Sequence, residues 1–146
     1  MEVYSFQDAT LTLSQDGFAD LSTAGQGIGE IVISYAADSF NDAGNIAADG
    51  VVVFSKIKQD NGTLSITCQQ TSSLHKNLVK RFNALYYSED TSVWASMNGI
   101  FKNKSTGEQK ILKGVAFHKI PDNSNQRTVQ NVTWEFDVAN LSTNII

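Results

Sequence analysis

The stretch VTWEFDV, residues 132–138, decides the fold, because large apolar residues alternate strictly with polar residues along it. A period of two residues is typical of a β-strand that buries one face and exposes the other. We therefore predict a strand over residues 128–139. Its apolar face, which carries Trp134 and Phe136, enters the core, and its other face is exposed.

Six further segments have the composition of strands, and they lie on both sides of one helical segment. Asn61-Gly62 is a strong turn signal, because both residue types accept the positive φ angles of a two-residue hairpin. We therefore predict that residues 51–57 and 63–69 pair. Residues 51–57 (VVVFSKI) are apolar on both faces, which predicts a strand buried on both sides. The other expected strands cover residues 3–13, 30–35, 93–104 and 108–120.

Residues 73–88 form the segment with helical periodicity. Its apolar residues recur three and four positions apart, which places them in one stripe. Ser72 stands where an N-cap belongs. We expect the stripe to pack on the sheet, with Leu78 and Phe82 among the core residues. The stripe consists of Leu74, Leu78, Phe82 and Leu85.

The rest of this helix carries its charge. Lys76, Lys80 and Arg81 lie off the apolar stripe. The ordinary interpretation is a solvated face or a salt-bridging interface between subunits, rather than a nucleic-acid contact. His75 has no second ligand at a useful spacing, so we expect it at the surface.

The order of the segments is strands, one helix, then strands, which argues against a doubly wound parallel sheet. A mainly β fold fits best, an antiparallel β-sandwich or barrel with one flanking helix over residues 73–88. The chain has 146 residues, the size of one domain, which we expect to span residues 1–146. Residues 36–50 are rich in Ala, Asp, Asn and Gly and predict a long projecting loop or hairpin.

The composition argues against several classes of protein. Lysine and arginine number 11 against 15 aspartates and glutamates, so the net charge of −4 offers no broad basic face for nucleic acid. One cysteine, Cys68, cannot form an internal disulfide, and two histidines leave few ligands for a metal. No apolar run approaches the roughly 18 residues of a membrane span. Glu2 stands where a signal peptide carries basic residues, so we expect none.

No constellation of catalytic residues is visible. The sequence lacks a Gly-x-Ser-x-Gly elbow, a His-Glu-x-x-His motif and an EF-hand loop. Glu135 and Asp137 would be a catalytic carboxylate pair only beside a sugar cleft, and a solvated polar face is the ordinary interpretation. Cys68 lies on an apolar strand face, which predicts a buried, unreactive thiol. We therefore predict no enzyme, and no catalytic residue, metal ion or cofactor.

Five short motifs follow one another along the whole chain. They are Tyr4-Ser-Phe6 with Asp8, the acidic segment 38–50, the helix from Leu74 to Tyr86-Tyr87, Val115-Ala-Phe117 with Pro121, and Trp134-Glu-Phe-Asp137. In this order and spacing the chain resembles the inner tail tube proteins of contractile-tailed bacteriophages and phage-tail-like bacteriocins.

The resemblance implies a structural subunit without catalysis. It implies homo-hexameric rings that stack into a hollow tube inside a contractile sheath, with sheath, baseplate and tape-measure proteins as partners. It places the protein in a virion tail or tail-like particle, made in the host cytoplasm and not inserted in a membrane. DNA would pass through the lumen without specific binding, and the acidic balance of the chain suits such a conduit, because a basic lumen would hold phosphates.

The loop at residues 36–50 is long enough to reach a neighbouring subunit or ring, so we expect it to act in assembly. Its candidate contact residues are Asp38, Phe40, Asn41, Asp42, Asn45 and Asp49.

Two alternatives stay open. One is the related tube of a type VI-like secretion system or bacteriocin, which carries effectors instead of DNA. The other is a small ligand-binding β-domain in which Trp94 or Trp134 stacks on the ligand. The alternation around Trp134 favours core packing over stacking.

Overall fold

The computed structural model describes residues 9–23, 28–37, 41–46, 50–56, 58–122, 128 and 130–145, without the side chains of residues 28, 41–46 and 53–55. The described residues form nine strands, one α-helix and one short 3₁₀ helix, so the prediction of a mainly β fold with one flanking helix is confirmed. The elements are β1 (Ala9–Ser14), β2 (Leu21–Ser22), β3 (Ile28–Tyr35), β4 (Asn41–Ile46), β5 (Val52–Lys56), β6 (Gly62–Gln69), α1 (Ser73–Tyr86), η2 (Thr91–Val93), β7 (Met97–Asn103), β8 (Glu108–Lys119) and β9 (Asn131–Ile145).

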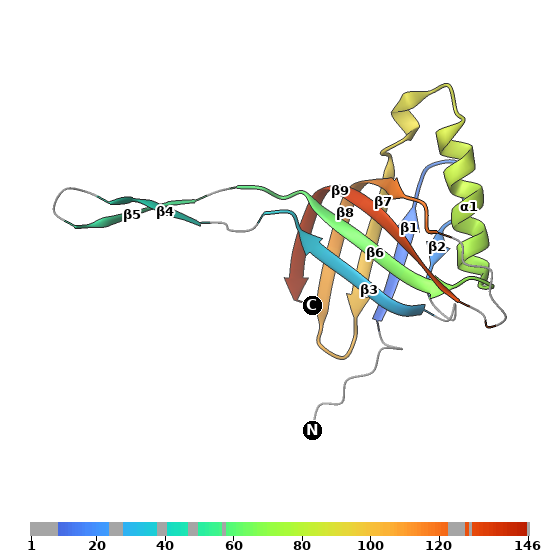
Figure 1. Ribbon diagram of the computed structural model, residues 1–146, viewed down its shortest axis with the longest axis horizontal. Helices are drawn as coiled ribbons and strands as arrows, with labels where there is room; N and C mark the ends of the chain where they lie inside the picture. Colours follow the sequence, from blue (N-terminus) through green and yellow to red (C-terminus); the bar gives the residue numbers. More distant parts are fainter. Residues whose placement is uncertain are drawn as a thin grey trace.

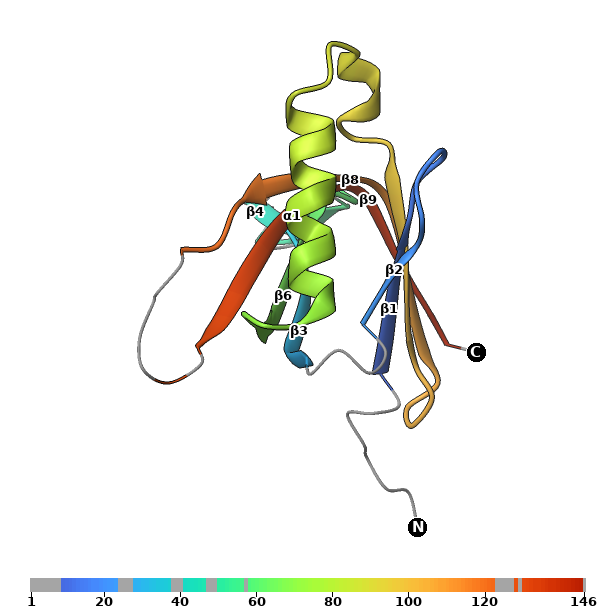
Figure 2. The ribbon, with the colours of Figure 1, turned by 90° about the vertical axis from the view of Figure 1, so that its right-hand side faces the viewer.

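Seven of the strands form one antiparallel sheet in the order β2-β1-β7-β8-β9-β6-β3. The sheet curls strongly, and α1 lies against one of its faces (Figure 2). The result is a half-barrel with two open edges. Within the described ranges, strands β4 and β5 pair only with each other, as a hairpin that extends far from the sheet (Figure 1).

Strand β9 lies inside the sheet, between β8 and β6, and supplies much of the core. Trp134 is fully buried and Phe136 is 1% exposed, while Glu135 between them is exposed. The strand runs on to Ile145, beyond the predicted end at residue 139, because it keeps pairing with β8. Its buried face shifts by one residue between Val138 and Leu141. This shift lies beside Gly114, where the pairing of β8 with β7 changes register. A Cβ at Gly114, whose φ is +70°, would lie only 2.9 Å from the Cβ of Ala139.

The helix packs its apolar stripe on the sheet, as its period indicates. Leu74, Leu78 and Leu85 are buried. Phe82 is partly buried against the same core, and its ring centroid lies 5.4 Å from that of Phe117. At the start of the helix, Ser72 is the N-cap, because its side chain accepts a hydrogen bond from the His75 backbone N–H.

The predicted pairing of residues 51–57 with 63–69 is wrong. Strand β5 pairs with β4, and β6 pairs with β3 and β9. Asn61 is not a hairpin turn residue, because its carbonyl accepts a hydrogen bond from the Ala36 N–H. Gly62 is needed for a close approach instead, since a Cβ there would overlap the Ser34 carbonyl oxygen. Val51 and Val52 are 56% and 43% exposed, so that end of the apolar run is not buried as expected.

The predicted strand over residues 93–104 is too long. Thr91–Val93 is a 3₁₀ helix, capped by the Asp90 carboxylate, which accepts from the Ser92 N–H, and β7 begins only at Met97. The predicted strand over residues 3–13 corresponds to β1, which begins at Ala9, and residues 3–8 lie outside the described part of the chain.

Arg81 and His75 are also not where the sequence placed them. Arg81 is only 5% exposed although it lies off the apolar stripe. Its guanidinium donates to the Ala19 carbonyl and to Gln15 Oε1, and it lies 4.5 Å from the centre of the Phe18 ring. His75 is half-buried against Trp134 rather than at the surface.

Candidate functional site

The β4–β5 hairpin carries the candidate assembly residues that the structure describes. Asn41, Asp42 and Asn45 lie in β4, where their backbones pair with Lys56, Ser55 and Val53 of β5. The other three candidates, Asp38, Phe40 and Asp49, lie outside the described residues.

In the described part of the chain, β4 and β5 pair with no strand of the seven-stranded sheet, yet apolar side chains are exposed beside them. Val51, just before β5, and Val52, the first residue of β5, are both exposed. A two-stranded hairpin is at best marginally stable alone in water. The two exposed valines are thus available for contact with another chain.

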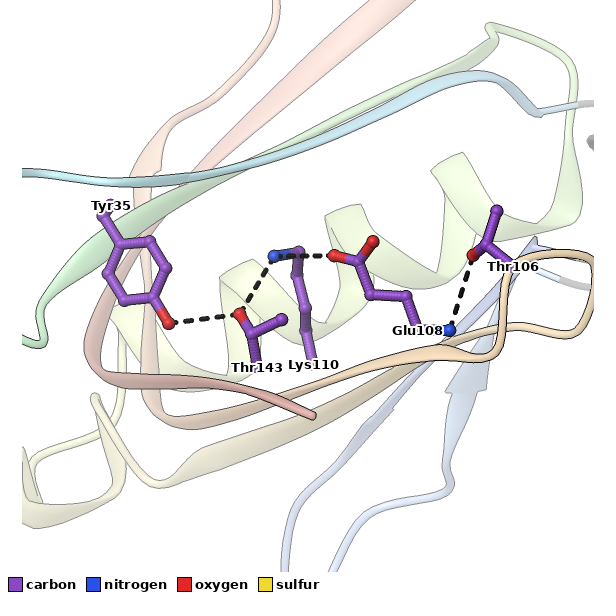
Figure 3. A network of polar contacts seen from close by, with 5 residues as sticks. All are labelled: Tyr35, Thr106, Glu108, Lys110 and Thr143. Atoms are coloured by element: carbon purple, nitrogen blue, oxygen red, sulfur yellow. Dashed lines mark hydrogen bonds and ion pairs between the residues drawn. The ribbon is translucent and has the colours of Figure 1, made fainter. Parts of the chain in front are cut away.

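The base of the hairpin is fastened to the sheet by backbone hydrogen bonds. The Ala36 N–H donates to the Asn61 carbonyl over 3.0 Å. This bond joins the two legs of the hairpin, namely the segment that leaves β3 and the segment that returns to β6. The Leu141 N–H of β9 donates to the Asp60 carbonyl over 2.7 Å. Beside these bonds, the side chains of Tyr35, Thr143, Lys110 and Glu108 form a polar network on the sheet (Figure 3).

The two edges of the curled sheet form a second candidate surface. Strand β3 has eight residues, and among the described strands it pairs only with β6, which leaves its other side open in this part of the chain. At the other edge β2 has two residues and covers only part of β1. Open strand edges present unpaired N–H and C=O groups, which favour pairing with a strand of another chain.

The sheet face opposite α1 is polar over β6 and β9. Thr133, Glu135 and Asp137 are exposed there. The Thr67 and Thr133 hydroxyls lie 3.1 Å apart, and His118 Nδ1 lies 2.9 Å from a carboxylate oxygen of Asp137. Glu135 and Asp137 are thus exposed to solvent on this face, as expected for a solvated polar face.

The described residues offer little material for chemistry. Within the described ranges, no three His, Cys, Asp or Glu side chains gather in a way that could hold a metal ion. Cys68 is buried, and burial raises the pKa of its thiol above the ordinary value, which lowers the fraction of reactive thiolate. Among the helices of the described residues, none is long and apolar enough to cross a membrane.

The sequence and the fold are both similar to those of known proteins. Residues 1–145 match the family model described as bacteriophage PhiTE tail tube protein. The chain belongs to this tail tube family. It is therefore a structural subunit of a tail tube, and the resemblance seen in the sequence is confirmed.

Solved structures share the fold of this tail tube protein at very low sequence identity. A chain in an extracellular contractile injection system, the PVC sheath–tube complex in its extended state, has 6% identity and a TM-score of 0.59, with 99% of this chain and 93% of that chain covered. A chain in the tail of an empty GTA particle has 8% identity, a TM-score of 0.58 and 99% of each chain covered. A chain in the anti-feeding prophage baseplate has 13% identity and a TM-score of 0.56, with 93% and 91% covered. No curated protein matches the sequence.

The sequence did not reveal the polar network beside the base of the hairpin of this tail tube protein. Tyr35, Lys110 and Thr143 come from three strands, and no local pattern connects them. The one related signal in the sequence is Gly62, which the Asn61-Gly62 pair presents as a turn residue, whereas in the structure it directly opposes Tyr35.

The four residues proposed for the core lie between α1 and the sheet, two on α1 and two on β9. Leu78, Trp134 and Phe136 are each at most 1% exposed, and Phe82 is partly buried against them. Trp134 is therefore closed to any ligand that stacks from solvent. Trp94 is half-exposed, but its ring packs on Phe82 and Phe117 at centroid distances of 6.2 and 6.4 Å.

Proposed function

We propose that this tail tube subunit assembles into six-membered rings, which stack into a hollow conduit inside a contractile sheath. The observation that carries the proposal is the curled sheet with an open edge at each end, β3 on one side and β1–β2 on the other. A ring in which β3 of one copy lies beside the β1–β2 edge of the next covers both edges at once. Closure removes the surfaces on which a half-barrel would otherwise aggregate.

The β4–β5 hairpin is proposed to connect each subunit to a neighbouring subunit or ring. It extends well beyond its own sheet (Figure 1) and exposes Val51 and Val52. Contact with another copy would bury these valines and support the isolated hairpin. The proposed contact residues remain Asp38, Phe40, Asn41, Asp42, Asn45 and Asp49.

The sheet face opposite α1 is proposed to line the conduit. It carries short hydroxyl side chains together with Glu135 and Asp137. Carboxylates repel the phosphates of passing DNA, and hydroxyls give no lasting anchor, so DNA can slide without specific binding. The helix-covered face is unsuited to this task, because its side chains form the core.

The partners that follow from this function are further copies of the chain, the sheath, the baseplate and a tape-measure protein. The subunit is made in the cytoplasm of the bacterial host and ends in the tail of the particle. It performs no catalysis. These assignments are supported by the family and by the fold shared with a sheath–tube complex and a baseplate.

Electron microscopy of the concentrated, purified protein tests the proposal. We expect hollow tubes or six-fold rings. If only small particles are seen, tail extract that contains baseplates is added to start growth. A protein that stays monomeric at every concentration and with baseplates present overturns the proposal.

A further inference from the structure

The polar network of Tyr35, Thr143, Lys110 and Glu108, called the Tyr35 network below, joins three strands beside the base of the β4–β5 hairpin (Figure 3). The Tyr35 hydroxyl at the end of β3 lies 3.1 Å from Thr143 Oγ1 of β9. Lys110 Nζ of β8 donates to Thr143 Oγ1 over 3.0 Å and lies 3.0 Å from Glu108 Oε1. The same ammonium lies 6.0 Å from the centre of the Tyr35 ring, at the outer range of a cation–π contact.

Gly62 allows Tyr35 to reach β9 across an intervening strand. The sheet order is β9-β6-β3, so β6 separates the two residues. In the register Tyr35 faces Gly62, and Gly62 faces Val138. At this level, therefore, no β6 side chain stands between Tyr35 and β9. A Cβ at Gly62 would lie 3.0 Å from Leu141 Cδ2 as well as overlapping the Ser34 carbonyl.

The network is a weak source of stability for the subunit. Thr143 is exposed, and the bonds from Tyr35 and from Lys110 to its hydroxyl lie in solvent. Exposed ion pairs and hydrogen bonds contribute little to the free energy of unfolding, because water competes for the same groups. A role in stability therefore does not explain why three strands contribute to the network.

Its position explains it better. Tyr35 is the last residue of β3 before the chain departs toward the hairpin, and the chain returns at Asp60 and Asn61. The return leg is held to β9 by the Leu141–Asp60 backbone bond. The Tyr35 network holds the departing leg to the same strand, so both legs are fixed to β9.

We propose that Tyr35, Thr143 and Lys110 are positioning residues that fix the direction in which the β4–β5 hairpin leaves the sheet. A hairpin held at one angle presents Val51 and Val52 to a neighbouring copy without losing further conformational freedom on contact. The expected effect of the network on tube assembly rests on the proposed function of the hairpin. Its expected effect on the direction of the hairpin is independent of that function.

Spin labels measure the direction of the hairpin in the single subunit. Labels are attached to cysteines introduced at the exposed positions Val52 in β5 and Lys102 in β7, and the buried Cys68 stays unlabelled. We expect Tyr35→Phe to broaden or shift the distribution of distances between the labels. The matched control is Thr133→Val, which removes one hydroxyl of a similar cross-strand pair on the opposite face. Equal distributions in the parent, the Tyr35 variant and the control overturn the proposal.

Tube formation by the unlabelled variants tests the second consequence. We expect Tyr35→Phe and Thr143→Val to lower the yield of tubes severalfold while the urea midpoint of the subunit stays unchanged. The double variant should be no worse than Thr143→Val alone, because that substitution already removes the contact with Tyr35 as well as the contact with Lys110. The Thr133→Val control should assemble like the parent. Normal yields of tubes from variants whose hairpins have changed direction overturn the link between hairpin direction and assembly. A parent protein that forms no tubes contradicts the proposed function instead. In that case the distance measurement alone decides whether the network fixes the hairpin.

Discussion

Trp134 and His75 join the centre of the sheet to the first turn of the helix. The indole N–H of Trp134 donates to Nδ1 of His75 over 3.1 Å, and the two ring centroids lie 5.7 Å apart. Only the neutral form of His75 with an unprotonated Nδ1 can accept this bond. The buried indole therefore selects both the tautomer and the charge state of the histidine.

Acid is expected to destabilise the subunit through this pair. Burial lowers the pKa of His75 below its ordinary value of 6.5, so the unfolded chain takes up the proton at a higher pH than the folded chain. The contribution of His75 to stability is therefore complete above pH 6.5. This contribution is lost as the pH falls from 6.5 toward the lower pKa that His75 has in the folded protein. Urea unfolding at a series of pH values should show this loss in the parent and a smaller one in His75→Gln. The exposed His118 provides the control variant, His118→Gln, and an identical pH profile for His75→Gln and the parent contradicts the prediction.

Removal of the Trp134 side chain should unfold much of the subunit population. Trp134 is fully buried and packs on Phe117, so Trp134→Ala creates a large cavity and costs about 3–5 kcal/mol. Urea unfolding followed by circular dichroism measures the loss. Trp94→Ala, at a half-exposed position, should cost clearly less. Equal losses for the two variants would show that Trp134 is not the better packed of the two.

Arg81 is expected to hold the β1–β2 connection against the helix through geometry as well as charge. Burial lowers the pKa of its guanidinium, and nearby Asp20 opposes that shift. Lysine cannot reproduce both the forked donors and the stacking on Phe18, so Arg81→Lys should lose about 1–3 kcal/mol of stability. Lys80→Ala, at the exposed neighbouring position, should change it by less than about 0.5 kcal/mol. A loss for Arg81→Lys no larger than that of the control contradicts this role.

Charged substitutions at the hairpin valines should separate assembly from folding. Val51→Asp and Val52→Asp change exposed side chains, so the urea midpoint should remain close to that of the parent. Burial of the new carboxylate against a neighbouring copy is costly, so tube growth should fall sharply. Sedimentation and electron microscopy measure the yield. Val79→Asp, on the exposed side of α1, serves as the control, and normal tubes from both hairpin variants would refute the contact.

Deletion of residues 41–45 removes most of β4 and gives a stricter test of the same element. The hairpin makes no sheet contact with the seven-stranded sheet, so the subunit should still fold. Tube growth should stop, because the proposed contact between copies is gone. Circular dichroism and electron microscopy of one preparation decide the result, and tubes of normal length would exclude a role for this segment.

The local pattern of the sequence was sufficient to predict which faces of the main strand and of the helix are buried. The alternation around Trp134 and Phe136 predicts which face of β9 is buried, and the spacing of Leu74 and Leu78 does the same for α1. Each prediction depends only on the period of a strand or helix, which residues close in sequence define. The family could likewise be recognised from motifs in order along the chain.

Sequence alone did not give the partners of these elements. The Asn61-Gly62 pair suggested a hairpin between β5 and β6, but Gly62 is small because Ser34 and Leu141 approach it closely. The position of Arg81 off the apolar stripe predicted a surface cation, but its guanidinium is buried and donates to oxygens of Ala19 and Gln15.

The mainly β class, the buried faces of the strands and helix, and the tail tube family can thus all be predicted from the sequence. The order of the strands, the position of the β4–β5 hairpin and the pairing of polar side chains come only from the folded structure. A period of two or 3.6 residues is defined by residues close together in the chain. Contacts such as Tyr35 with Thr143 join residues that are distant in the chain and meet only after the sheet has formed.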